Sequence, residues 1–355
     1  MRKESVLIGM SGGVDSSVAA FLLQQKDYDC VGCTMTLYCP PGTEETNVRD
    51  ANAVASRMGI PFHVFDFQQS FHDKVIGNFI RCYESGLTPN PCIQCNRHLK
   101  FGVMLEKALQ LGCNYVATGH YARIRRDEET GRYLLYKAAD RAKDQTYFLY
   151  SLTQHQLSHT LFPLGELTKG EARDIAEAQG FITARKKDSQ DICFVPDGDY
   201  VSFMKEYTGK TYPMGDYLDE TGKVIGKHQG AVCYTLGQRK GLGIALGAPV
   251  YVCAKDMQKN TITVGPNESL LRNALRAVDF NWIPFPALTE PIRVTAKIRH
   301  SQNEQPATVY PEEDGSVRVV FDTPQWAITP GQAVVLYQDD MVVGGGTITE
   351  SFTII

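Results

Sequence analysis

The sequence predicts an α/β protein built from a parallel-sheet domain, a small mixed domain and a C-terminal antiparallel β-barrel. Three observations predict this order. Strand patterns alternate with helical patterns over about the first 200 residues, turn residues then become frequent, and short alternating strands fill the remainder. A chain of 355 residues also exceeds what one hydrophobic core usually organises. We expect domains at residues 1–200, 201–274 and 275–355.

The first domain is predicted from four β-rich runs and the helical stretches between them. The predicted strands are Val6–Gly9, Cys30–Tyr38, Phe62–Phe67 and Tyr115–Thr118, and the predicted helices are Ser17–Gln25, Asn47–Met58, Phe71–Tyr83 and His98–Leu111. Strand–helix–strand repeats at this spacing indicate a parallel sheet with helices on both faces. A further helix is expected from Thr168, which forms a capping box with Glu171, to Gly180.

The rest of the chain is predicted to be mainly β-structure. Val250–Ala254 and Thr261–Gly265 flank a turn and indicate a hairpin in the mixed domain. Residues 292–299 alternate apolar and polar side chains strictly, as in a half-buried strand. Further strands are expected at Ala307–Tyr310, Val317–Phe321, Ala333–Tyr337 and Met341–Val343. This series predicts a small antiparallel barrel.

Composition excludes some classes of protein and leaves others open. With 43% apolar residues the chain is not a long disordered protein, and 36 basic against 40 acidic side chains give a net charge of −4. That total does not exclude RNA, because one basic face is enough to bind it. The N-terminus lacks the apolar run of a signal peptide, and no stretch is apolar enough to cross a bilayer. We therefore expect a cytoplasmic protein without a membrane partner, whose ten cysteines stay mostly reduced.

A Gly-rich turn between the first strand and the first helix predicts phosphate binding. The turn reads Gly9-Met10-Ser11-Gly12-Gly13-Val14-Asp15-Ser16. Glycines let backbone N–H groups approach an anion, and a helix N-terminus adds partial positive charge. Asp15 would be repelled by bare phosphate, so it indicates either a Mg²⁺ held against the phosphates or a helix N-cap. The string is neither a Walker A motif nor a dinucleotide fingerprint.

Three cysteines lie in polar surroundings that suggest chemistry. Cys92 and Cys95 follow a two-proline turn at the expected start of a helix, with Arg97 and Lys100 close in sequence, so we expect thiolate to be favoured there. Cys193 lies among charged residues.

The competing interpretation is a zinc site that adds Cys30 and Cys33 to Cys92 and Cys95. Against it, a spacing of three in a strand points the side chains of Cys30 and Cys33 to opposite faces. The remaining cysteines in apolar surroundings are expected to be small buried hydrophobes.

Taken together, the motifs resemble a known enzyme family. The Gly-rich turn is similar to the pyrophosphate (PP) loop of the N-type ATP pyrophosphatases. In order along the chain, this loop, Asn90-Pro91 with Cys95, residues 117–123, residues 143–148, Cys193, residues 237–243, residues 296–300 and residues 330–332 resemble the bacterial tRNA-specific 2-thiouridylase (MnmA) family. The resemblance spans essentially the whole chain.

The resemblance implies a role for each matching residue. ATP would be bound by Gly9, Met10, Ser11, Gly12, Gly13, Val14, Asp15, Ser16, Met35 and Gly119. Cys193 would carry sulfur as a persulfide, and Cys95 would be the nucleophile that joins it in a transient disulfide. The target base would meet Asn90, Pro91 and Cys92. Contacts with tRNA would come from His120, Lys143, Asp144, Gln145, Arg299, His300 and Gln332.

The resemblance also implies the reaction and the partners. The C2 oxygen of the wobble uridine would be adenylated by ATP with Mg²⁺ and then replaced by the persulfide sulfur, giving 2-thiouridine, AMP and pyrophosphate. A cysteine desulfurase or a sulfur-relay protein would supply the sulfur. The alternatives are a PP-loop ligase acting on a small metabolite, which needs neither Cys95 nor Cys193, and a tRNA-binding or metal-storage protein that retains the loop without catalysis.

One position departs from the family pattern. Many members carry an aspartate where this chain has Cys92, which leaves the general acid or base unassigned. It also gives three candidate thiols, so a second hypothesis is an iron–sulfur cluster on Cys92, Cys95 and Cys193. The simpler interpretation is that Cys92 lines the base pocket.

Several basic side chains around the site could hold phosphates: Arg97, Lys100, Arg123, Arg125, Arg126, Arg185, Lys186 and Lys187. For the last three, a solvated charged face is the alternative interpretation.

Overall fold

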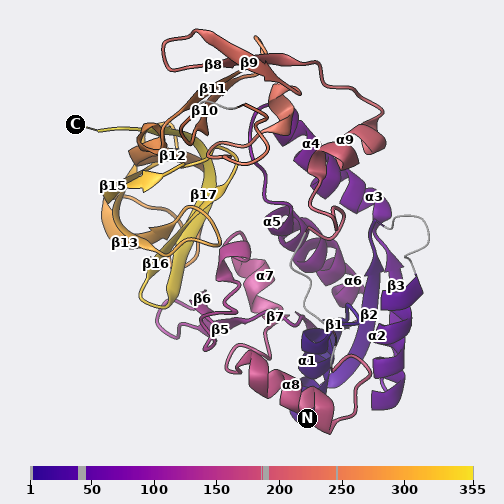
Figure 1. Ribbon diagram of the computed structural model, residues 1–355. Helices are drawn as coiled ribbons and strands as arrows, with labels where there is room; N and C mark the ends of the chain where they lie inside the picture. The colour runs from indigo at the N-terminus through magenta and orange to yellow at the C-terminus, as the bar shows by residue number, and fades with distance from the viewer. Residues whose placement is uncertain (1–2, 39–44, 185, 187–191, 245–246, 355) are drawn as a thin grey trace.

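The computed structural model describes residues 3–38, 45–184, 186, 192–244 and 247–354. It contains a parallel sheet, a smaller mixed sheet and a large antiparallel sheet that closes on itself. In Figure 1 the parallel sheet and the barrel lie on opposite sides of helix α5 (Pro91–Cys95), and β8–β11 lie at the top of the view, beside the end of the barrel. The predicted α/β class and the order of sheets are therefore confirmed.

The N-terminal sheet has the order β3-β2-β1-β4-β7, and its strands are parallel. The strands are β1 Ser5–Gly9, β2 Asp29–Thr36, β3 Phe62–Asp66, β4 Tyr115–Ala117 and β7 Thr160–Leu161. Neighbouring residues of β1 enter different cores, Val6 and Ile8 on one face and Leu7 on the other. Both faces of the sheet are thus buried, as the apolar run predicts.

Helices cover each face. One face packs against α1 Val14–Gln25, α2 Glu45–Met58 and α8 Lys169–Ala178. The other face packs against α3 Gln68–Phe71, η1 His72–Ile76, α4 Gly77–Glu84, α5 Pro91–Cys95, η2 Asn96–Val103 and α6 Met104–Gln110. The short helices η3 Thr146–Phe148 and α7 Gln154–Ser158 follow. The predicted capping box of Thr168 and Glu171 is present at the start of α8.

One helix begins earlier than the sequence predicts. The predicted start at His98 is wrong, because α5, η2 and α6 run on from Pro91 to Gln110 without a break. Asn90 caps this helix by accepting a hydrogen bond from the Ile93 N–H, and Pro91 occupies the first helical position, where its missing N–H costs nothing. The middle of the helix, Asn96–Val103, is π-helical, a geometry that often accompanies functional sites.

The mixed domain contains α9 Tyr200–Thr208 and a four-stranded sheet of order β10-β11-β8-β9. Its strands are β8 Gly215–Leu218, β9 Val224–His228, β10 Tyr251–Asp256 and β11 Thr261–Gly265, with η4 Ala231–Cys233 between β9 and β10 and η5 Asn267–Leu270 after β11. The predicted hairpin is confirmed, since β10 and β11 pair antiparallel.

The antiparallel sheet closes because β12 pairs with both β15 and β17. Its strands are β12 Leu271–Trp282, β13 Ile292–Lys297, β14 Gln305–Pro311, β15 Val317–Trp326, β16 Ala333–Gln338 and β17 Met341–Phe352. The predicted barrel is confirmed, although the sequence reading missed β12 and ended β17 too early. Two strands of the N-terminal segment, β5 Ala122–Arg126 and β6 Tyr133–Lys137, continue this sheet beyond β17.

Candidate nucleotide and thiol site

The topology of the parallel sheet places a ligand site beside β1. The chain leaves β1 toward β2 on one side and returns at β4 on the other, so the strand order reverses between β1 and β4. In open α/β sheets ligands bind at such a switch point, outside the carboxyl ends of the strands. Gly9 ends β1, and Gly119 follows just after β4. The predicted nucleotide-binding segments therefore meet at this edge.

The Gly-rich turn has the geometry of an anion-binding loop. Gly12 has a φ of +68°, and a Cβ atom there would lie 2.8 Å from the backbone oxygen of Asn47. Gly13 is the N-cap of α1, and no side chain caps the helix, which leaves the first N–H groups directed outward. Ser16 Oγ accepts from the Ser11 N–H at 3.2 Å and donates to the Gly13 oxygen at 3.2 Å, which fixes the loop. This cradle fits a phosphate group.

Gly119 and Met35 border the same loop. A Cβ atom at Gly119 would come within 2.7 Å of Asp15 C and Ser16 N, so only glycine lets the segment after β4 approach the loop this closely. Met35 lies near the carboxyl end of β2 and is half-buried, and Met10 donates its N–H to Cys33 of the same strand at 2.7 Å. Gly119 and Met35 both lie at the edge where an adenosine would extend from the phosphates.

Asp15 is held by partners that the sequence did not reveal. Its two carboxylate oxygens each accept from Lys169 Nζ at 2.8 Å, and one also accepts from the Tyr121 hydroxyl at 2.9 Å. The alternative that Asp15 caps the helix is wrong, because Gly13 is the N-cap and no side chain caps it. Lys169, the first residue of α8, is nearly buried and brings a cation to the loop. The capping box of α8 was the signal that could have located it.

Lys186 is a second cation at the loop. Its Nζ donates to the Gly12 oxygen at 3.0 Å, to Asn47 Oδ1 at 3.1 Å and to Asp50 Oδ2 at 3.1 Å. It therefore ties the glycine turn to α2, and for this residue the interpretation as a solvated face is wrong. The neighbouring Arg185 and Lys187 lie outside the described residues.

Two of the candidate thiols lie at the start of the long helix. Cys92 is the second residue of α5 and is exposed, whereas Cys95 ends α5 and is buried in the main core. Arg97 is used elsewhere, because its guanidinium pairs with Asp279 of the barrel. Lys100, one turn beyond, is the cation that acts on the thiols.

The electrostatics of the thiols differ from the expectation of favoured thiolate. Burial raises the pKa of Cys95, and the nearby Lys100 ammonium lowers that pKa only in part. Cys92 and Cys193 have exposed side chains, yet desolvation by the surrounding protein raises the pKa of both. The Cys95 and Cys92 thiols add to the effect at Cys193, whose pKa is raised to about 12. The expectation is wrong in this conformation, since desolvation outweighs the cation and the helix N-terminus.

Cys193 is brought near the other two thiols by an aromatic anchor. Phe194 and Val195 are buried in the main core, where the Phe194 ring packs against Phe71 and Phe79 at centroid distances of 5.7 and 5.2 Å. The charges of the Cys95 and Cys92 thiols both raise the pKa of Cys193, which indicates that the three thiols share one region. Cys95 and Cys193 are 98 positions apart in sequence (193 − 95). Among the described cysteines none forms a disulfide.

The three thiols do not form a metal site in this conformation. Within the described part of the chain, no group of three or more His, Cys, Asp or Glu side chains is placed to hold a metal ion. Cys92, Cys95 and Cys193 therefore do not fit an iron–sulfur cluster as they stand. Cys30 lies in the core on one face of the parallel sheet and Cys33 in the core on the other, as their spacing predicts, so these two thiols cannot share one zinc ion.

His120 follows Gly119 and contacts the helix that carries Cys92 and Cys95. It is only 8% exposed, its Nδ1 is 2.7 Å from Thr118 Oγ1, and its ring packs against Phe101 and Phe162. Burial and the Lys100 ammonium hold the pKa of His120 well below its ordinary value, so the imidazole is neutral at pH 7. Lys100 thus acts on His120 and on all three thiols.

Two segments predicted to contact tRNA lie together although they are far apart in sequence. The His300 ring packs on Phe148 at a centroid distance of 4.4 Å, three residues after Gln145. The Phe148 oxygen accepts from Asn96 Nδ2 at 3.0 Å, next to Cys95. Arg299 donates to the Ala327 oxygen at 2.8 Å and lies over the Trp326 ring, and burial lowers its pKa.

Other members of that predicted set are engaged within the protein. The Asp144 carboxylate accepts from the Ala138 N–H at 3.0 Å and from Thr146 Oγ1 at 2.6 Å, and burial raises its pKa. Gln145 Oε1 accepts from the Tyr121 N–H at 2.9 Å. Lys143 is half-buried beside them. Gln332 extends from the barrel to the segment before Asn90.

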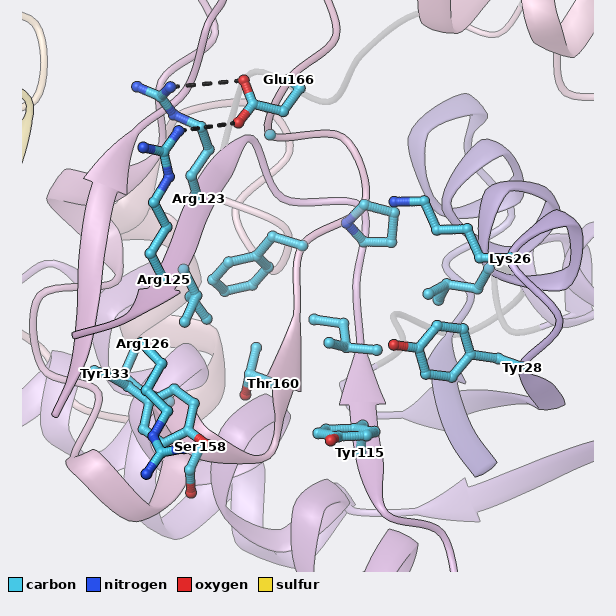
Figure 2. Close-up of a pocket in the computed structure, with 17 residues that line it drawn as sticks. Lys26, Tyr28, Tyr115, Arg123, Arg125, Arg126, Tyr133, Ser158, Thr160 and Glu166 are labelled. Carbon is cyan, nitrogen blue, oxygen red and sulfur yellow. Dashed lines mark ion pairs between the residues drawn. The ribbon is translucent and has the colours of Figure 1, made fainter. Parts of the chain in front are cut away.

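A separate pocket of about 330 Å³ gathers three of the predicted phosphate-binding arginines (Figure 2). Arg123 and Arg125 point toward Glu166, at 3.6 and 3.5 Å, while Arg126 lies beside Tyr133. Lys26, Tyr28 and Tyr115 line the opposite wall. None of the residues predicted to bind ATP, the base or sulfur lines this pocket.

No helix among the described residues combines the length and the apolar character needed to cross a membrane.

Solved structures resemble the chain only distantly. A U34-tRNA thiolase, NcsA from Methanococcus maripaludis with its [4Fe-4S] cluster, is 16% identical with a TM-score of 0.35, covering 58% of this chain and 66% of that one. A 4-thiouridine synthetase–RNA complex with bound ATP is 15% identical with a TM-score of 0.38, covering 58% of this chain and 50% of that one.

Sequence comparisons are far closer. Family models match residues 4–197 (tRNA methyl transferase HUP domain), 201–266 (tRNA methyl transferase PRC-barrel domain) and 272–348 (aminomethyltransferase beta-barrel domain). The tRNA-specific 2-thiouridylase MnmA of Clostridioides difficile is 50% identical over 98% of this chain and 99% of its own length. That of Symbiobacterium thermophilum is 52% identical over 97% of this chain and 91% of its own length. The model descriptions name a methyl transferase, but these relatives align over almost their full length and are the better guide. The chain belongs to the tRNA-specific 2-thiouridylase family.

Proposed function

We propose that this chain is an ATP-dependent tRNA sulfurtransferase that replaces the C2 oxygen of the anticodon wobble uridine with sulfur. The observation that carries the proposal is the contact of His120 with the helix that carries Cys92 and Cys95. His120 follows Gly119, which approaches the phosphate loop closely, and its ring packs on Phe101 of that helix at a centroid distance of 5.8 Å. This link between a phosphate loop and a helix with two thiols suits a reaction that activates a base and then transfers sulfur to it.

The loop from Gly9 to Ser16 serves the first half of the reaction. The uridine C2 oxygen attacks the α-phosphorus of ATP, the bond from that phosphorus to the bridging oxygen breaks, and pyrophosphate leaves. The open N–H groups of α1, with Lys169 and Lys186 close by, stabilise the negative charge on the phosphates. Met35 and Gly119 border the adenosine. Asp15 holds Lys169 beside the loop, and its carboxylate would be the group that holds a Mg²⁺ accompanying ATP, which would neutralise charge on the phosphates.

The thiols serve the second half. A cysteine desulfurase or sulfur-relay protein loads Cys193 as a persulfide, and its terminal sulfur attacks the activated C2, so that AMP leaves with the former C2 oxygen. The Cys95 thiolate then attacks Cys193 Sγ and breaks the S–S bond, which leaves sulfur on the base and a Cys95–Cys193 disulfide. A two-electron thiol reductant restores both thiols.

The remaining assignments concern tRNA. Asn90, Pro91 and exposed Cys92 form the turn where the target base, flipped from its stack, meets the protein. His300, with Phe148 beneath it, offers a stacking surface beside Asn96. His120 is neutral and buried, so it would contact RNA through hydrogen bonding rather than charge. We assign further tRNA contacts to Lys143, Asp144, Gln145, Arg299 and Gln332.

The test is reconstitution with ATP, tRNA and a cysteine desulfurase supplied with cysteine as the sulfur source, followed by mass spectrometry of the nucleosides. We expect 2-thiouridine and AMP in equal amounts, and loss of 2-thiouridine from the tRNA of cells that lack the protein. A methylated nucleoside without AMP would instead support a methyltransferase. Pyrophosphate–ATP exchange that ignores tRNA and needs no cysteine would support a ligase for a small metabolite.

A further inference from the structure

A loop of the barrel holds the segment that leads into the proposed base-binding turn. Thr88 donates its N–H to the Pro330 oxygen at 2.9 Å. Gln332 Nε2 donates to the Thr88 oxygen at 2.9 Å and to the Pro89 oxygen at 3.2 Å. Thr88 therefore uses both of its backbone groups on the barrel, 242 positions away in sequence (330 − 88).

Gly331 brings the two segments closer than any other residue could. Its φ is +92°, and a Cβ atom there would lie 2.7 Å from Thr88 N and 2.9 Å from Leu87 Cβ. Atoms at these separations clash, and most of them belong to backbone that cannot swing aside. The close approach is thus built into the loop at this position.

The barrel loop is itself firmly anchored. Gly331 donates its N–H to the Ile348 oxygen at 2.8 Å, and Ile348 donates its N–H to the Gln332 oxygen at 2.9 Å. Ile348 is buried in the barrel core. The loop therefore moves with the barrel as one body.

The held segment has few supports of its own. Pro89 and Pro91 have no N–H to donate, and the Thr88 hydroxyl oxygen is buried without a hydrogen-bond partner. A buried hydroxyl without a partner is unfavourable, so other contacts must hold Thr88 in place. Asn90 follows directly as the N-cap of α5, and exposed Cys92 is the second residue of that helix. Any displacement of Thr88 is passed to Cys92 within four residues.

We propose that Gly331 and Gln332 are positioning residues, which set the place of the Asn90–Cys92 turn and so couple the barrel to sulfur transfer. This inference rests on the proposed function of that turn. It also changes the expected role of Gln332, whose side-chain amide is engaged with Thr88 and Pro89 and acts on the base through them. The reacting groups remain those of the turn and the thiols.

The experiment compares Gly331→Ala and Gln332→Met with Gly315→Ala in the full-length protein. Gly315 is the matched control, because it lies in the barrel at a φ of +80° with nothing within 4 Å of its Cβ position. The first measurement is the alkylation rate of Cys92 by iodoacetamide without tRNA, read by peptide mass spectrometry. The second is kcat and KM for tRNA in the thiolation assay.

We expect Cys92 alkylation to change at least about threefold in Gly331→Ala and in Gln332→Met, with kcat lowered roughly 10- to 100-fold and KM within about twofold, since a shift of about 1 Å has such effects on catalysis. Gly315→Ala should match the wild type in both assays. Thermal melts identify a variant that fails to fold, and Gln332→Met, which adds no atom at the close approach, then decides.

An unchanged alkylation rate with a raised KM would show that Gln332 only contacts tRNA, and would overturn the inference. An equal loss in Gly315→Ala would overturn it too, by showing a general effect of barrel strain. If no protein, wild type included, makes 2-thiouridine, the proposed function fails, whereas the alkylation rates still decide whether the barrel loop positions the turn.

Discussion

The phosphate loop and the thiol cluster differ in how completely each is formed before a substrate binds. The loop from Gly9 to Ser16 is fixed by internal hydrogen bonds, by the close approach of Gly119 and by two lysines that meet it from α8 and from residue 186. Its N–H groups already point outward. A nucleotide can therefore bind without rearrangement of this part.

The three thiols have raised pKa values instead. Burial raises the pKa of Cys95, desolvation by the surrounding protein and then the neighbouring thiols raise that of exposed Cys193, and the described residues hold no arrangement of thiols that binds a metal ion. Because the thiolate is the nucleophile, sulfur transfer has to await a change in the surroundings of these groups. The nucleotide site is therefore formed before a substrate binds, whereas the thiols require a change in their surroundings before they transfer sulfur.

Replacing Cys193 or Cys95 should separate the adenylation step from the sulfur-transfer step most strongly. We expect Cys193→Ser and Cys95→Ser to lose thiolation below detection while keeping tRNA-dependent exchange of pyrophosphate into ATP, because neither thiol touches the phosphate loop. Cys253→Ser, in β10 of the mixed domain, is the control. Efficient thiolation by Cys193→Ser with an ordinary persulfide donor would remove the persulfide role. Peptide mapping of oxidised wild type should find the Cys95–Cys193 pair.

A change in the phosphate loop should disable both adenylation and sulfur transfer. Gly12→Val places a side chain where a Cβ atom already comes within 2.8 Å of the Asn47 oxygen, so we expect the exchange rate to fall by about 100-fold or more. Gly59→Val is the matched control, since Gly59 has the same φ of +68° and nothing within 4 Å. Thermal melts of the two variants should agree within a few degrees. Normal exchange by Gly12→Val would contradict the position of the nucleotide.

Lys100 should affect the pH dependence of the thiol alkylation rate. Lys100 lowers the pKa of Cys92, Cys95 and Cys193, so Lys100→Met raises these pKa values further above neutrality. The thiolate fraction at a given pH then falls, and the alkaline rise of the thiol alkylation rate moves to higher pH. We expect a loss of roughly three- to tenfold at pH 8. Lys107→Met, on α6 of the same helix, is the control and should leave the profile in place.

The smallest effect is expected at Cys92. As a residue that lines the base pocket, Cys92→Ala should retain thiolation within about tenfold, and anaerobically purified wild type should be active, colourless and free of iron. Iron analysis and an absorbance spectrum check this expectation. A brown protein that loses colour and activity together in Cys92→Ala would instead establish the cluster and show that the thiols rearrange to bind it.

Local patterns predicted most of the fold. Buried β1, the α8 capping box and the β10–β11 hairpin follow from side-chain period and caps, which depend on neighbours in the chain. The start of the long helix was missed because Pro91 reads as a turn residue unless the cap at Asn90 is recognised. Strand β12 was not predicted because its residues do not alternate regularly, and it is stabilised by pairing with two strands that are distant in sequence, β15 and β17.

Site residues that belong to a sequence motif could be predicted, whereas residues that only the fold brings to the site could not. The sequence indicates the loop at Gly12 and Gly13, but the ion pair of Asp15 with Lys169 joins residues 154 positions apart (169 − 15). The sign of the cysteine pKa shifts was also out of reach. It depends on desolvation, which burial in the core decides, and the neighbouring cations visible in the sequence do not.

The hairpin β5–β6 has a consequence for how the protein can be divided. Strand β6 joins the barrel sheet at β17, where Met341 faces Tyr136 and the Lys137 N–H bonds the Asp340 oxygen at 2.8 Å. A fragment that ends near residue 200 would expose the Leu134–Tyr136 edge to solvent, and an uncovered apolar edge strand recruits other chains. We expect such a fragment to aggregate during expression, and co-expression of residues 201–355 to restore its solubility. The catalytic half would thus need its barrel to remain in solution at all.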